Sequence, residues 1–133
     1  MQCFKNAQQI EQVDLLDRAF HYGDGCFSTA RIRQGQIELL ALHIARLKLS
    51  NERLKLNADL SLIEDTLKLL RKQDVVNGTL KIVLSRGIGQ RGYSLPEHPA
   101  DVWVFYYPKA VADFEYETVE SGVLHQAIGL TMP

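Results

Sequence analysis

The chain has 133 residues, of which 46% are hydrophobic and 23% charged, a composition typical of one soluble domain with a modest core. Its net charge of -1 is made of interspersed signs, which disfavours nucleic-acid binding, and no apolar run approaches the roughly 20 residues that cross a bilayer. Cys3 and Cys26 form no C-x-x-C pair, so we predict reduced thiols in a cytoplasmic protein.

A hairpin is the first predicted element. Residues 26–40 read as two strands around Gln34-Gly35, a short turn that glycine makes easy. A helix is expected over roughly residues 40–56, because leucine and isoleucine recur there at helical spacing. Asn57-Ala58-Asp59 breaks that pattern and should end the helix.

A second helix is predicted to begin at Ser61, which forms an S-x-x-E capping box with Glu64, and to end near Lys72. Asn77-Gly78 is expected to turn the chain into a half-buried strand. The apolar positions of that strand alternate with polar or outward-facing ones and are Leu80, Ile82 and Leu84.

The last part of the chain is predicted to leave this domain. Residues 102–107 are apolar on both faces, as in a central strand covered on each side. A polar connector follows, and residues 122–132 read as a strand with no partner in the remaining sequence. Residues 1–108 are therefore expected to form one small α+β domain, with an antiparallel or mixed sheet and two helices. Residues 109–133 would be a connector and the first strand of a second domain.

Residues 87–92 read G-x-G-x-x-G after a strand, the pattern of a dinucleotide-binding turn. That motif needs a helix directly after it, whereas Pro96 and Pro99 follow here. A long loop is the better prediction, and loops of this kind carry function more often than packing.

The run from Asp17 to Arg31, followed by His43-Ile44-Ala45-Arg46-Leu47, closely resembles the N-terminal signature of the fold-type-IV pyridoxal-phosphate enzymes. These class IV aminotransferases comprise branched-chain and D-amino-acid aminotransferases and aminodeoxychorismate lyases. The resemblance spans residues 17–93 and implies the small N-terminal domain of the D-amino-acid-aminotransferase-like fold. Ser28 resembles the lyases, because the aminotransferases usually carry a glutamate at that position.

The resemblance implies pyridoxal 5'-phosphate as cofactor, a small-molecule substrate and a homodimer. A lyase of this family releases pyruvate from 4-amino-4-deoxychorismate and leaves 4-aminobenzoate for folate synthesis. The family's cofactor-binding lysine comes later than Pro133, so the chain resembles an N-terminal half that contains no catalytic residue and is inactive alone. None of the lysines present matches that position, and Lys81 is expected to alternate outward from an apolar strand face.

Five residues are candidates for binding. The resemblance places Arg46 against the cofactor phosphate, to which a guanidinium can donate two charge-assisted hydrogen bonds. Arg91, with Tyr93 beside it, resembles the loop whose arginine grips a substrate carboxylate. Phe27 stands where some relatives place a substrate-facing tyrosine, and either lines the pocket or belongs to the core. Arg31 alternates to the same strand face as Phe27 and is a second candidate anion ligand.

Purely structural roles remain as alternatives for some of these residues and are expected for others. Arg46 and Arg91 also fit solvent-exposed arginines, and His43 a capping or packing residue. Arg86 is expected to be a structural ion-pair partner, and Asp24 to accept hydrogen bonds from backbone N–H groups of a tight turn. The four histidines lack metal-ligand spacing, so no metal is expected. Two other functions remain: a class IV aminotransferase, and a non-catalytic domain that binds a phosphate-bearing ligand or a partner.

Overall fold

The computed structural model describes residues 1–75, 77–88 and 98–109 of the chain. They form one six-stranded sheet with the strand order β2-β1-β6-β5-β3-β4, in which every pairing is antiparallel. The predicted α+β class is confirmed, with a purely antiparallel sheet in the described part. The elements are β1 (Gln2–Lys5), β2 (Gln8–Gln9), α1 (Arg18–Tyr22), β3 (Gly25–Arg33), β4 (Gln36–Ile37), α2 (Leu40–Arg53), α3 (Ser61–Arg71), β5 (Gly78–Ser85) and β6 (Asp101–Pro108).

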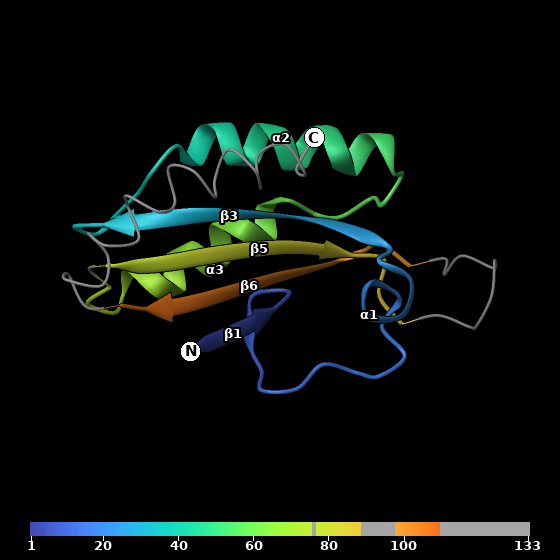
Figure 1. Ribbon diagram of the computed structural model, residues 1–133, viewed down its shortest axis with the longest axis horizontal. Helices are drawn as coiled ribbons and strands as arrows, with labels where there is room; N and C mark the ends of the chain where they lie inside the picture. Colours follow the sequence, from blue (N-terminus) through green and yellow to red (C-terminus); the bar gives the residue numbers. More distant parts are fainter. Residues whose placement is uncertain (76, 89–97, 110–133) are drawn as a thin grey trace.

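The hydrophobic core lies on one face of the sheet, because alternate residues of a strand point to the same side. The strands β5 and β6 are paired so that Ile82 lies opposite Val104, and both side chains are almost fully buried. The helix α3 packs on this face and lies behind the sheet in Figure 1. Its apolar stripe contributes Ile63, Leu67 and Leu70 to the same core.

The helix α2 runs alongside β3 (Figure 1). The short strand β4 pairs only with Ile32 and Arg33 at the end of β3, so within the described part of the chain most of β3 has a strand partner on one side only. Leu47 anchors α2 in the core and is 1% exposed. A helix beside an edge strand keeps other chains from pairing with that edge.

Both predicted helices and the predicted hairpin are confirmed. Ile32 pairs with Ile37 across the turn, and Gln34 and Gly35 both have positive φ, as the twist of a two-residue hairpin requires. The helix α2 ends at Arg53 rather than near residue 56. Residues 101–108 form an interior strand between β1 and β5, as the apolar pattern indicated.

The predicted capping box at Ser61 is wrong. Leu60 already has helical backbone angles, so Ser61 lies inside the first turn instead of in front of it. The carboxylate of Asp59 accepts hydrogen bonds from the Ser61 N–H at 3.0 Å and from its hydroxyl at 2.6 Å. The hydroxyl is therefore used as a donor and does not cap the N–H groups of the helix.

Three elements were not predicted: β1, β2 and α1. They have two to five residues each, too few for a hydrophobic period to be recognised. The predicted strand at 122–132 and the connector before it lie outside the described residues, so the domain limit near residue 108 stays a prediction. Within the described ranges, no helix is long and apolar enough to cross a membrane.

Alanine substitutions at Gly25 and Gly23 test how closely β3 approaches β5. A Cβ atom at Gly25 would lie 2.2 Å from the carbonyl oxygen of Leu84, whereas one at Gly23 would meet nothing within 4 Å. Gly23 has a φ of 62°, so only the backbone penalty acts there. We expect Gly25→Ala to cost about 3 kcal/mol of unfolding free energy by overpacking, and Gly23→Ala about 1 kcal/mol. Urea denaturation measures both, and equal losses would contradict the close approach.

Candidate functional site

The start of β3 is fixed by an ion cluster around Asp24. Its carboxylate accepts from Arg18 Nε at 2.9 Å, and its two oxygens accept from Arg86 Nε at 2.9 and 2.8 Å. Burial alone would raise the pKa of Asp24, but the hydrogen bonds and charges of the two arginines outweigh it and lower the pKa. The expected bonds to backbone N–H groups are wrong, because charged donors compete better for a half-buried carboxylate. The ion-pair role expected of Arg86 is confirmed.

Arg86 also reaches the end of α2, where it donates to the carbonyl oxygens of Leu54 at 2.8 Å and Lys55 at 3.3 Å. Next to it, the Ser85 hydroxyl donates to Asp17 Oδ1 at 2.5 Å, and Asp17 caps α1. In Figure 1, α1 lies at the end of the sheet where β5 ends and β3 begins. These bonds fix α1, β3, β5 and the end of α2 relative to one another.

His43 connects α2 to the middle of β3. Its Nδ1 lies 2.5 Å from Oγ of Ser28, whose side chain is 1% exposed. The structural role expected of His43 is confirmed as a contact between elements. It is not a cap, since the N-cap of α2 is Leu39 and makes no side-chain hydrogen bond.

Arg46 lies one helical turn after His43 and is half-buried. Among the described residues, its guanidinium has no hydrogen bond or ion pair. The guanidinium groups of Arg18, Arg71 and Arg86, by contrast, each pair with a carboxylate at 2.7 to 2.9 Å. Two planar N–H pairs on a half-buried arginine suit the oxygens of a phosphate or carboxylate.

Phe27 and Arg31 lie on the face of β3 opposite the core, so Phe27 is not a core residue. Phe27 is 43% exposed. On the same face, Lys81 of β5 is in register with Thr29, and its Nζ lies 4.9 Å from the centroid of the Phe27 ring. Phe105 continues this face on β6, opposite Lys81. This open face of the sheet therefore joins aromatic and cationic side chains.

Lys81 alternates outward from β5, as the strand pattern predicts. Its place beside Phe27 is not predicted by that pattern. The strand that supplies Phe27 is more than 50 positions earlier, so the contact depends on strand pairing that no local pattern reveals. Arg91 and Tyr93 lie outside the described residues and stay predictions.

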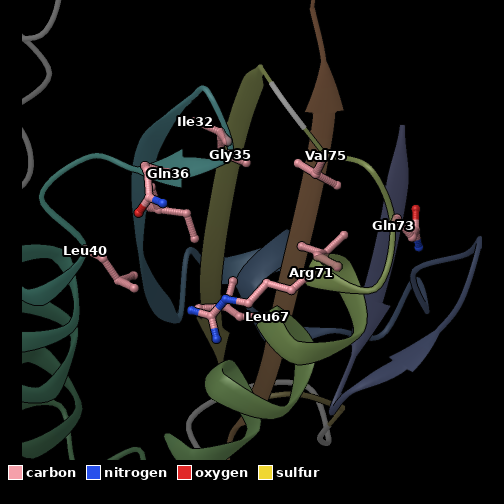
Figure 2. Close-up of a pocket in the computed structure, with 10 residues that line it drawn as sticks. Ile32, Gly35, Gln36, Leu40, Leu67, Arg71, Gln73 and Val75 are labelled. Atoms are coloured by element: carbon pink, nitrogen blue, oxygen red, sulfur yellow. The ribbon is translucent and has the colours of Figure 1, made fainter.

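A pocket of about 420 Å³ lies elsewhere, between the β3–β4 hairpin and α3 (Figure 2). Its floor is formed by core residues such as Ile32 and Leu67, and Arg71 stands at the side. Arg46, Phe27 and Arg31, the predicted binding residues that the structure describes, do not line it.

His98 joins the two ends of residues 88–99. Its Nε2 lies 2.8 Å from the carbonyl oxygen of Ile88 and its Nδ1 2.9 Å from that of Pro99. Both acceptors are carbonyls, so both bonds form only when both ring nitrogens carry a proton. These two bonds, with a smaller effect from Asp101, raise the pKa of His98 against the opposing effects of burial and Lys5.

Comparison with known proteins gives one consistent family. Residues 25–127 match the family model described as Amino-transferase class IV. Aminodeoxychorismate lyase from Vibrio harveyi is 34% identical over 122 residues, which cover 89% of this chain and 45% of the relative. D-alanine aminotransferase from Staphylococcus epidermidis is 31% identical over 119 residues, covering 87% of this chain and 42% of the relative.

A solved structure agrees. The crystal structure of 4-amino-4-deoxychorismate lyase from Pseudomonas aeruginosa is similar with a TM-score of 0.71 and 29% identity, over 81% of this chain and 40% of that one. The chain thus spans less than half the length of the relatives it matches.

Replacing Asp24 tests the ion cluster. A carboxylate with a lowered pKa stabilises the fold above its unfolded pKa of about 3.9, and that contribution is lost as the pH falls through the lowered value. We expect Asp24→Asn to cost about 2 to 4 kcal/mol of unfolding free energy near neutral pH and much less in strong acid. The control is Glu64→Gln, because Glu64 pairs with Arg71 on the surface, where loss costs about 1 kcal/mol or less. A pH-independent effect of Asp24→Asn would contradict this reading.

Replacing His98 tests the second group whose pKa is shifted by folding. Its contribution to the unfolding free energy should change with pH in the opposite direction to that of Asp24. A histidine whose pKa is raised by folding stabilises fully below its unfolded pKa of about 6.5, and loses that effect as the pH rises through the folded value. The unfolding free energy of wild type should therefore exceed that of His98→Gln by more at about pH 5.5 than at about pH 8.5. Denaturant titration at both pH values checks this, and a larger gap at the higher pH would show the sign to be wrong.

Proposed function

The chain belongs to the class IV aminotransferase family, and on that premise we propose that it holds the cofactor phosphate and one wall of the substrate site in a pyridoxal-phosphate enzyme. The proposal depends above all on Arg46. This arginine is half-buried on α2, beside the tether between His43 and Ser28, and has no carboxylate partner among the described residues. A guanidinium in that setting matches the oxygens of a phosphate monoester.

The residues present fit pyridoxal 5'-phosphate by their donor chemistry. When bound, this cofactor supplies an electron sink for bond cleavage next to the substrate nitrogen. In our proposal Arg46 binds its phosphate, and Phe27 lines the substrate pocket. Arg31 and Lys81 provide positive charge for substrate carboxylates on the same strand face. Arg91 and Tyr93 are proposed to complete the substrate site.

We propose 4-amino-4-deoxychorismate as substrate, with pyruvate and 4-aminobenzoate as products, which places the enzyme in folate biosynthesis in the cytoplasm. Three observations support this choice. The lyase from Vibrio harveyi is 34% identical, Ser28 stands where aminotransferases usually carry a glutamate, and two cations share the face of Phe27. The substrate carries two carboxylates, so two cations match its charge.

The cofactor-binding lysine is proposed to come from the part of the protein that corresponds to the remaining length of the relatives, after Pro133. The residues described here would then bind and orient cofactor and substrate while that lysine acts in the chemistry. A homodimer is part of the same proposal. The alternative is an aminotransferase such as one acting on D-alanine, which is supported by the 31% identity to the enzyme from Staphylococcus epidermidis.

Replacing Arg46 tests the phosphate site. Losing the charge-assisted bonds should raise the Kd of the intact protein for pyridoxal phosphate by about 10- to 100-fold in Arg46→Ala. The matched control is Arg53→Ala, which removes an exposed arginine from the last turn of the same helix and should leave the Kd unchanged. The visible absorbance of bound cofactor gives both values. Equal Kd values for the two variants would refute the assignment of Arg46.

An assay of the intact, cofactor-loaded protein distinguishes the two activities. The lyase proposal predicts stoichiometric release of pyruvate and 4-aminobenzoate from 4-amino-4-deoxychorismate without added amino acceptor. Formation of pyruvate from D-alanine only when a second 2-oxo acid is present would favour the aminotransferase instead.

A further inference from the structure

The side of α2 that faces β3 carries a polar stripe. His43, Arg46 and Ser50 are three and four residues apart, so they lie along one side of the helix. Nδ1 of His43 lies 2.5 Å from the buried hydroxyl of Ser28. Arg46 is therefore one helical turn from a polar contact between the helix and the strand.

This contact ends on β3. Ser28 points to the core face of that strand, where it lies opposite Ile82 of β5. The apolar contacts of α2, made through Leu47 and its neighbours, are non-directional and tolerate small rotations of the helix. Hydrogen bonds lose strength quickly when their angle or length changes. The bond between His43 and Ser28 restricts the rotation of α2, and the bonds from Arg86 to the carbonyl oxygens of Leu54 and Lys55 hold the end of the helix.

A buried hydroxyl at Ser28 also needs this partner. It is 1% exposed, and a hydroxyl in such a place destabilises the fold unless it is hydrogen-bonded. The hydrogen bond between Ser28 and His43 thus favours one rotation of α2. It does so with a polar group at a buried position where an apolar side chain would pack.

We infer that Ser28 and His43 are positioning residues for Arg46, holding α2 in the rotation that aims the guanidinium at the phosphate of the ligand. The inference rests on the proposed function of Arg46. It assigns Ser28 no chemistry of its own, because its hydroxyl is enclosed and bonded to the helix. Arg86 supplies the second point of attachment on the far side of Arg46, through its bonds to the carbonyl oxygens of Leu54 and Lys55.

The test measures binding of inorganic phosphate, which occupies the phosphate site alone, and of pyridoxal phosphate to the intact protein. Ser28→Ala and His43→Leu should each weaken both about five- to tenfold, which corresponds to one lost hydrogen bond. The double variant should be no weaker than either single one, because both remove the same bond. His43→Asn, whose amide can still bond Ser28, should restore binding to within about twofold of wild type.

Asn51→Ala is the matched structural control. Asn51 also lies on α2 and makes two hydrogen bonds with the backbone of Ala58, at 3.1 and 2.9 Å, but it is not part of the polar stripe. It should lower the unfolding free energy as much as Ser28→Ala does and leave phosphate binding unchanged. This separates positioning from general loss of stability.

The outcomes are distinct. Loss of phosphate binding in Arg46→Ala together with wild-type binding in Ser28→Ala and His43→Leu would overturn this inference and leave the proposed function standing. Equal weakening in Asn51→Ala would also overturn it. Phosphate binding that does not depend on Arg46, or no binding by the unaltered protein, would refute the phosphate site and the inference together.

Discussion

The ion cluster in which Asp24 binds Arg18 and Arg86 connects more elements of the fold than any of its single contacts does. It joins the residue that precedes β3 to the residue that follows β5, more than 60 positions later. Arg86 extends the connection to the carbonyl groups after α2. The ion cluster around one half-buried carboxylate thus connects the start of β3 to the end of the helix that carries Arg46.

The two faces of the sheet make different contacts, and the side chains of β3 contribute to both because they alternate between the faces. Ser28 points to the core side and bonds α2, whereas Phe27 points to the open side and lies under the ammonium group of Lys81. The closeness of β3 to β5 brings Lys81 over Phe27, and Gly25 permits it because a Cβ atom there would strike the carbonyl of Leu84. The glycines of this segment thus serve strand packing as well as turns.

Polar contacts set the geometry where apolar packing cannot. The core residues Leu47 and Ile82 would tolerate several settings of α2 at similar cost, because their contacts have no preferred direction. Hydrogen bonds from His43 and Arg86 restrict the helix at two places along its length. This division, with apolar burial for stability and directional bonds for position, suits an element that must present one arginine to a small anion.

Local patterns in the sequence predict the α+β class, the hairpin, both long helices and the strands β5 and β6, because each has a hydrophobic period or turn residues that act over a few neighbouring positions. It also placed Phe27 and Arg31 on one strand face, since alternation is local. Three contacts follow only from the three-dimensional arrangement: Lys81 lies over Phe27, Asp24 binds two arginines, and Ser28 bonds His43. These contacts join positions far apart in the chain, and the choice among charged partners depends on strand register and helix placement, which no local pattern encodes. The short elements β1, β2 and α1 likewise depend on contacts with distant parts of the chain, because their own few residues carry no recognisable pattern.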